Sequence, residues 1–405
     1  MPLQQNTRLD YLDAVRSFAL ILGVIFHASL SFMPIFIGWA VMDISTSNVV
    51  AVFALISHSF RLELFFLISG FFAHMNFHQK GSNTFIKSRL VRIAIPFIIG
   101  WFLLRPLLIS AWIMGAESMS GDVNIWPAIV SGFASLLSIE SFDKGFLVGT
   151  HLWFLYYLLL ISVSTIVLRY LISLNKSVKS FIEPLVDSIV CWLCTSRFVI
   201  LIIAIPTACC LWFMNNWGMD TPDKSLIPNI PVLLIYGGFF LFGWLLHRQP
   251  ALLDKFANLT WSKILLCITA IITTVILSKF EMNLAHSQYK LLKACSLLSY
   301  AIMMWSMVAL TIGACKHLFK RSNKTIRYIA DSSYWLYLIH LPNVIFLQIA
   351  FAELPFHWGV KLISICALTI MFSILLYDVF VRPSFIGAIL NGKKRASVLL
   401  KKYQL

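Results

Sequence analysis

The sequence predicts an all-α fold, a polytopic transmembrane helical bundle of about ten spans, and two observations support it. Hydrophobic residues make up 59% of the chain and charged residues 12%, with a mean hydropathy of +0.84. A water-facing surface cannot be built from this composition. Apolar runs of about 20 residues, long enough to cross roughly 30 Å of hydrocarbon, recur along the whole chain. We therefore expect residues 1–405 to form a single membrane domain.

Ten apolar segments are the expected spans. In order along the chain they cover residues 12–34, 50–76, 91–114, 149–172, 198–215, 231–247, 262–279, 292–314, 334–351 and 360–381. Basic residues gather in the loops after the second, fourth, sixth and eighth spans and in the C-terminal tail, whereas residues 36–48 contain none. Because Lys and Arg accumulate on the cytoplasmic side, this pattern predicts that both termini are cytoplasmic.

The same loops account for the formal net charge of +15, so we expect the lipid bilayer and no nucleic acid as a partner. Cys191 and Cys194 form a C-x-x-C motif without a second pair, and we interpret them as packing residues. We expect no metal site and no tightly bound cofactor.

The first span carries ionisable residues where lipid should be. Arg16 and His27 are eleven positions apart, and at about 100° per residue they share one helix face, with Asp13 beside Arg16. His27 should lie about 16 Å deeper than Arg16. One interpretation is structural: Asp13 pairs with Arg16, and His27 hydrogen-bonds a neighbouring helix. The other is a hydrophilic track in which His27 acts as a general base. The pattern alone leaves both open.

Polar residues also interrupt later spans. Arg61 and Glu63 are two positions apart and cannot face each other on a helix, so each needs a partner on another helix or a cavity. Gly70 allows close contact between helices. Other polar residues within or at the ends of spans are His58, Lys87, Arg89, Arg92, His151, Tyr337 and His340.

These segments together resemble the membrane acyltransferase-3 family, in whose first span an Arg is followed after ten residues by a His, as in Arg16 and His27. Similar pieces are FFLISGFF in the second span, RLVRIAIP entering the third, HLWFL opening the fourth and WLYLIH late in the chain. The resemblance implies a multi-pass O-acyltransferase of the bacterial inner membrane. It would move an acyl group from cytoplasmic acyl-CoA, its donor substrate, to a hydroxyl of a periplasmic glycan.

Within the family, the chain is most similar to enzymes that succinylate osmoregulated periplasmic glucans. O-acetylation of lipopolysaccharide or exopolysaccharide is the alternative. A proton- or anion-coupled transporter is an alternative of another class, because it too would need buried Arg, Glu and His.

The resemblance also implies roles for individual residues. His27 would be the general base, and Arg16, oriented by Asp13, would guide the donor. Candidates for the acyl-CoA phosphates, which suit forked and compact cations, are Arg61, Lys87, Arg89 and Arg92. Candidates for the acceptor side or for stabilising an oxyanion are His58, His151, Tyr337 and His340. A succinyl group would need a further cation for its carboxylate, either Arg61 or Arg105.

Overall fold

The computed structural model describes residues 10–137, 150–223, 225–320 and 323–401. These described residues form helices and connecting loops without any strand, which confirms the predicted all-α class. Nine helices in this part of the chain are long and apolar enough to cross a membrane, or ten if one bent helix pair counts as a span. The predicted bundle of about ten spans is therefore confirmed.

The spanning helices follow the predicted order. They are α1 (Asp10–Ser29), α2 (Asn48–Lys80), the continuous run α3–η2–α4 (Ser82–Arg89, Leu90–Ala94, Ile95–Ser118), α7 (Trp153–Leu174), α10 (Ile230–Arg248), α12 (Trp261–Leu277), α13 (Tyr289–Leu318), α14 (Lys324–Phe351) and α15–η4 (Trp358–Leu376, Tyr377–Val381). Shorter helices are α5 (Ile125–Ala134), α8 (Lys176–Thr195), α9 (Val199–Trp212), α11 (Pro250–Phe256), α16 (Phe385–Asn391) and α17 (Val398–Lys401).

The fifth predicted span, residues 198–215, differs from the others. It corresponds to α9, whose 14 residues extend about 21 Å and fall short of the roughly 30 Å of hydrocarbon. Between the preceding helix α8 and α9 the helix direction bends by 115°. The fifth span is therefore one arm of a bent pair rather than a straight crossing.

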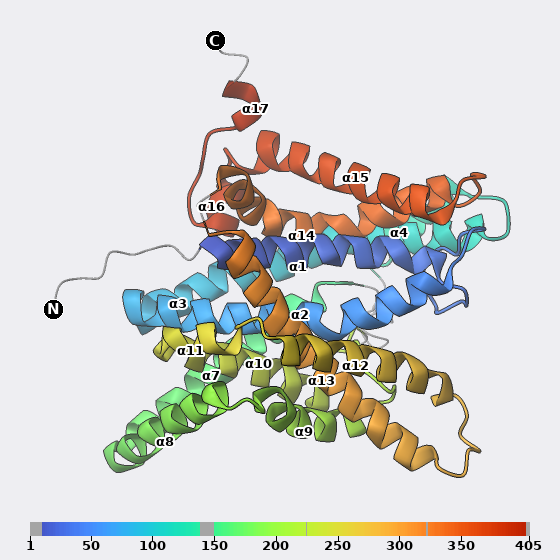
Figure 1. The fold of residues 1–405 in the computed structure, drawn as a ribbon. Coiled ribbons are helices and arrows are strands. Elements are labelled where there is room, and N and C mark those ends of the chain that lie inside the picture. Colours follow the sequence, from blue (N-terminus) through green and yellow to red (C-terminus); the bar gives the residue numbers. More distant parts are fainter. Residues whose placement is uncertain (1–9, 138–149, 224, 321–322, 402–405) are drawn as a thin grey trace.

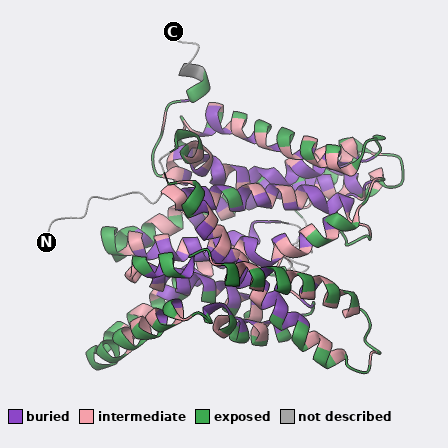
Figure 2. Cartoon of the chain, viewed as in Figure 1, coloured by how far each residue is buried: buried purple, intermediate pink, exposed green. Residues whose placement is uncertain are grey.

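Two groups of helices lie on either side of α2. Figure 1 shows α1, α14 and α15 side by side in one group, and α9, α10, α12 and α13 in the other. Both ends of the described chain lie at the same end of the bundle, which we call the terminal end (Figure 1). Burial differs among the spans (Figure 2). Within the most apolar 18 residues of each span, 67% are buried in the helices that contain α1 and α13, but only 17% in the helix that contains α12. The helix that carries Arg16 and His27 is thus central.

Close packing of α2 against α10 depends on two glycines. A Cβ on Gly70 would lie 1.9 Å from the carbonyl oxygen of Phe240, and a Cβ on Gly243 would lie 1.9 Å from that of Leu67. Each helix therefore rests its backbone against the other at a residue without a side chain, as small residues permit in membrane bundles. The close helix contact predicted at Gly70 is confirmed.

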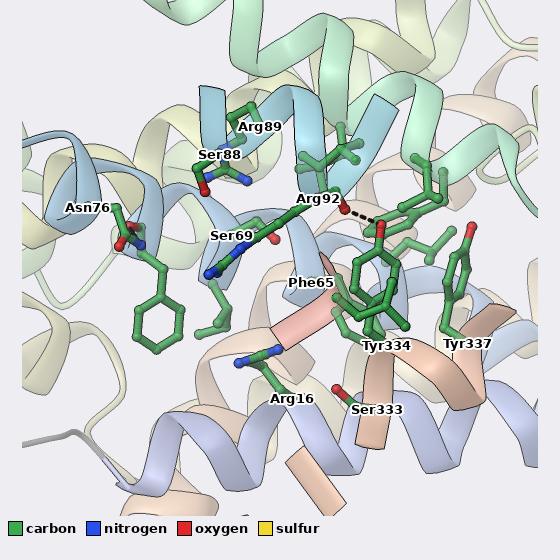
Figure 3. A pocket seen from close by; sticks show the side chains of 18 of the residues that line it. Arg16, Phe65, Ser69, Asn76, Ser88, Arg89, Arg92, Ser333, Tyr334 and Tyr337 are labelled. Atoms are coloured by element: carbon green, nitrogen blue, oxygen red, sulfur yellow. Dashed lines mark hydrogen bonds between the residues drawn. The ribbon is translucent and has the colours of Figure 1, made fainter. Parts of the chain in front are cut away.

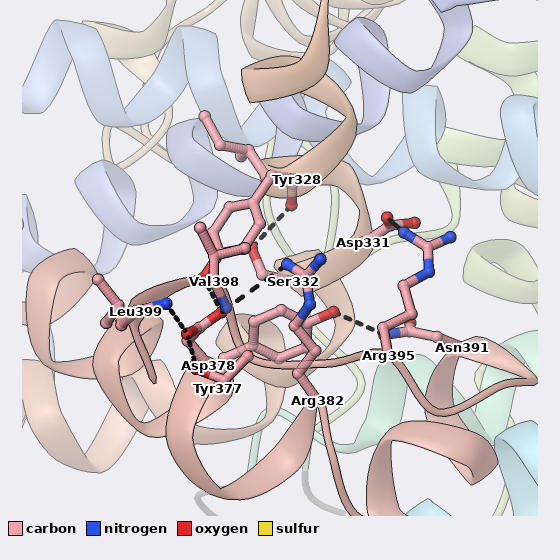
Figure 4. Close-up of polar contacts among 12 residues, drawn as sticks. Tyr328, Asp331, Ser332, Tyr377, Asp378, Arg382, Asn391, Arg395, Val398 and Leu399 are labelled. Carbon is pink, nitrogen blue, oxygen red and sulfur yellow. Dashed lines mark hydrogen bonds and ion pairs between the residues drawn. The ribbon is translucent and has the colours of Figure 1, made fainter. Parts of the chain in front are cut away.

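The C-terminal tail, residues 392–401, is fastened to the terminal end by Asp378 (Figure 4). This fully buried carboxylate accepts hydrogen bonds from the Tyr328 hydroxyl and from three groups of the tail: the Ser397 hydroxyl and the backbone N–H groups of Val398 and Leu399. An ion pair also joins Arg395 of the tail to Asp331 on α14. These contacts hold the tail against the helices of the bundle.

A buried ion pair fastens the opposite end. Lys361 Nζ lies 2.7 Å from Asp43 Oδ1 and donates a second hydrogen bond to the carbonyl of Ala352. Both charged side chains are buried, at 0% and 2% exposure. Because Asp43 belongs to the loop between α1 and α2, this pair holds that loop against α15.

Candidate functional site

A cavity of about 330 Å³ lies among α1, α2, the α3–η2–α4 helix, α7 and α14. Figure 3 shows the guanidinium groups of Arg16, from α1, and of Arg89 and Arg92, from the α3–η2–α4 helix, at this cavity. None of the described lining residues is acidic. Three arginines without a carboxylate among the lining residues suit an anionic ligand such as a phosphate group.

Local backbone structure places Arg92 in this wall. Residues Leu90–Ala94 form a π-helical turn, a conformation that occurs often at functional sites. Pro96 has no N–H to donate to the carbonyl of Arg92 four residues earlier. The Tyr334 hydroxyl on α14 donates to that oxygen instead. The turn and the proline thus create a polar tie between the helix that carries two of the arginines and α14.

Arg16 enters the cavity from α1 beside a buried partner. Its Nη1 lies 3.6 Å from Asp13 Oδ1, at the i, i+3 spacing, and Asp13 is only 5% exposed. The pair predicted from the sequence is therefore present, and Asp13 is placed to orient Arg16. On the helix that follows α2, the Arg89 guanidinium lies 4.9 Å from the ring of Phe85.

Three imidazole rings meet beside the C-terminal part of α1. They belong to His27 on α1, His151 just before α7 and His340 on α14, and we call them the histidine cluster. The ring centroids of His27 and His340 are 5.3 Å apart, and those of His340 and His151 are 5.1 Å apart. His151 Nε2 bonds the carbonyl of Leu338 at 3.0 Å, and His340 Nδ1 bonds that of Tyr337 at 2.8 Å. Three histidines that the sequence scatters over three spans thus meet at one place.

Tyr337 lines the cavity and also contacts the histidine cluster. It lines the cavity, its ring centroid lies 5.2 Å from that of His151 and 6.2 Å from that of His340, and its hydroxyl donates to the His151 carbonyl at 2.7 Å. The arginine-lined cavity and the histidine cluster are therefore adjacent and meet at this tyrosine.

Arg61 lies with the histidine cluster rather than in the cavity. Its guanidinium is 4.1 Å from the ring centroid of Phe26, the neighbour of His27, and its Cδ would be 3.7 Å from a Cβ on Gly23. It is 6% exposed, and its Nη1 has no hydrogen-bond partner among the described residues. Glu63 is fully buried, and within the same part of the chain neither of its carboxyl oxygens has a hydrogen-bond partner.

The remaining predicted residues lie around these two places. His58 Nε2 is 3.2 Å from the Thr221 hydroxyl, and its ring packs against Phe26 at the edge of the histidine cluster. Lys87 is exposed on α3 and does not line the cavity. Arg105 is buried on α4, where its guanidinium lies 4.9 Å from the Trp101 ring, and it too is outside the cavity lining.

Three residues near the site were missed by sequence reasoning. Tyr334 lines the cavity beside Tyr337, Trp39 stacks on His27, and Gln348 bonds both Trp39 and the backbone of His27. The sequence signal for Gln348 was usable, because a polar amide near the end of an apolar span needs a partner when it is buried. Trp39 carried none, since a tryptophan in an outward loop is typical of an aromatic belt.

Comparison with known proteins finds a matching family and similar relatives. A model of an acyltransferase domain matches residues 9–378. The chain is similar to glucans biosynthesis protein C of Escherichia coli (strain K12), with 23% identity over 400 residues covering 95% of this chain and 94% of the relative. It is also 23% identical to the protein of the same name from Salmonella typhi over 387 residues, which cover 95% of this chain and 94% of the relative. No solved structure matches the chain.

Proposed function

The chain belongs to the membrane acyltransferase-3 family, and from this premise we propose that it moves an acyl group from cytoplasmic acyl-CoA to a hydroxyl of a periplasmic glycan. The proposal places the chain in the bacterial inner membrane with both termini in the cytoplasm. The terminal end of the bundle would then face the donor and the opposite end the acceptor.

The contact between the cavity and the histidine cluster at Tyr337 is the observation that carries this proposal. Arg16, Arg89 and Arg92 would bind the phosphates of acyl-CoA, since a guanidinium matches a phosphate with two parallel hydrogen bonds. The thioester would lie toward Tyr337, within reach of the imidazoles. Lys87, exposed on α3, remains a candidate only for a phosphate that projects beyond the cavity.

The chemistry requires one proton to change place. His27 would accept the proton of the sugar hydroxyl as its oxygen attacks the thioester carbonyl. The C–S bond of the tetrahedral intermediate would then break, and the proton would pass from His27 to the departing thiolate. The products are an O-acyl glycan and free CoA thiol. The ring nitrogen of His151 or His340 that bonds no backbone carbonyl would, when protonated, donate to the oxyanion before the C–S bond breaks. Tyr337 would shape the acceptor side, because its hydroxyl is already donated to the His151 carbonyl.

We further propose succinyl as the acyl group and a glucan as the acceptor. The name of the relatives, glucans biosynthesis protein C, supports a glucan. Arg61 supports a dicarboxylic acyl group, because its guanidinium beside the histidine cluster has one nitrogen without a hydrogen-bond partner in the described structure. Acetyl transfer to another envelope glycan is the alternative, and the mass added to the product distinguishes the two.

The test uses the full chain, purified in detergent, with succinyl-CoA or acetyl-CoA as donor and periplasmic glucan as acceptor. His27→Ala should abolish product formation, while the control His317→Ala, at an exposed position outside the site, should retain it. Mass spectrometry of the glucan identifies the acyl group. Activity retained by His27→Ala would remove the proposed base, and a wild-type protein inactive with both donors would refute the proposed reaction.

A further inference from the structure

The buried side chain of Gln348 on α14 joins three parts of the molecule. It is 1% exposed. Its Nε2 donates to the carbonyl oxygens of His27 and Ala28, at 3.0 and 3.1 Å, and its Oε1 accepts from the indole N–H of Trp39 at 2.9 Å. The oxygen and both N–H groups of this amide are therefore occupied, as a polar group buried in an apolar bundle requires.

Two of these bonds act on the end of α1. The last carbonyls of a helix have no donor within the helix, and α1 ends at Ser29 before a short 3₁₀ turn. By bonding the carbonyls of His27 and Ala28, Gln348 fixes the turn of backbone from which the His27 side chain projects.

The third bond acts on the His27 ring through Trp39. The indole of Trp39 stacks on the imidazole with centroids 5.6 Å apart and planes at 18°, and it rests edge-on against Trp112 at 5.3 Å. His340 lies 5.3 Å away. His27 Nδ1 is buried and has no hydrogen-bond partner in the part of the chain that the structure describes. Ring packing, rather than a hydrogen bond to Nδ1, therefore orients this imidazole.

We propose that Gln348 is a positioning residue for His27, which acts by fixing both the final turn of α1 and the indole that stacks on the imidazole. The inference rests on the proposed role of His27 as the general base. Gln348 is not among the described residues that line the cavity, whereas Arg16, Arg89 and Arg92 are. Its contribution should consequently lie in the chemical step and leave donor binding alone.

The test compares two variants and their combination. Gln348→Leu removes all three hydrogen bonds at similar volume, and Trp39→Phe keeps an aromatic ring but removes the indole N–H. Because a displacement of about 1 Å costs around 100-fold in rate, each should lower kcat about 10- to 100-fold while the KM for succinyl-CoA stays within about twofold. If Gln348 acts through Trp39, the double variant should lose little more than the more damaging single variant.

The matched control is Thr207→Val. It removes the hydrogen bond that Trp305 Nε1 donates to the Thr207 hydroxyl at 2.9 Å, another buried indole bond between helices, away from His27. We expect normal kcat for this control at a similar loss of thermal stability. Equal kcat losses in Gln348→Leu and Thr207→Val would overturn the proposal, as would losses that multiply in the double variant. If Gln348→Leu does not fold, the kcat of Trp39→Phe decides: a wild-type value overturns the proposal. A failure of the proposed function gives a different result, since His27→Ala itself would then retain activity.

Discussion

Replacing Gly392 with Ala should weaken donor binding by displacing Arg92. Gly392 follows α16 with φ of +81°, and a Cβ there would lie 1.8 Å from Arg92 Nη2. The guanidinium would have to retreat by at least 1.6 Å to reach the 3.4 Å of ordinary contact. A hydrogen bond to a charged group contributes about 1.5–3 kcal/mol, and each 1.4 kcal/mol is tenfold in affinity. The KM for acyl-CoA should therefore rise about 10- to 100-fold, with kcat little changed.

Gly81 provides the matched control for this substitution. It has nearly the same φ, +79°, but a Cβ there would meet no atom within 4 Å. Its ψ of 165° differs from the −1° of Gly392 and lies in a region that glycine almost alone adopts, so Gly81→Ala should strain the backbone at least as much, with no arginine within 4 Å of the added Cβ. Steady-state kinetics and thermal unfolding in detergent measure both effects. Equal KM values for the two variants would refute the assignment of Arg92 to the donor phosphates, as would an additive effect when Arg92→Gln is combined with Gly392→Ala.

Three further outcomes follow from the packing and hydrogen bonds. Gly243→Ala should destabilise the bundle by about 1–3 kcal/mol in thermal unfolding, since its Cβ meets backbone, whereas Gly237→Ala, with open space, should not. Lys361→Met should cost about 3–5 kcal/mol by leaving Asp43 buried without its partner, and adding Asp43→Asn should restore part of that loss. Tyr337→Phe removes a hydrogen bond of about 1 kcal/mol to the His151 carbonyl, so kcat should fall roughly five- to tenfold. A wild-type kcat would exclude that contribution.

The relative positions of residues along one helix could be predicted from the sequence, and this explains why the Asp13–Arg16 pair on α1 was predicted correctly. The eleven-residue interval of Arg16 and His27 fixes their shared face, and the i, i+3 interval fixes the pairing of Asp13 with Arg16. Apolar run length likewise predicted the spans, except for α9, where a bend divides an apolar stretch. In each successful case the information is local.

Neighbours on different helices were not predictable in this way. Arg61 and Arg92 were both candidates for the donor phosphates, yet the first packs on Phe26 and only the second lines the cavity. Which of them reaches the cavity depends on how α2 packs against α1 and α10, and the spacing within one span carries no such information. The contact between Gln348 and His27 joins residues 321 positions apart and required the assembled bundle.

The apolar part of the cavity lining bears on how a thioester could survive in the site. It comprises Leu62, Phe65, Phe154, Leu155 and Leu158, among others, and Figure 3 shows Phe65 beside the polar side chains of Ser333 and Tyr334. Water is poorly accommodated beside apolar groups, and a site that excludes water suppresses hydrolysis of a reactive acyl donor. The thioester would then lie against these apolar side chains, between the arginines of the cavity and the imidazoles that contact Tyr337. Transfer would await a hydroxyl that reaches the histidine cluster from the opposite end, which couples acyl release to the presence of the acceptor.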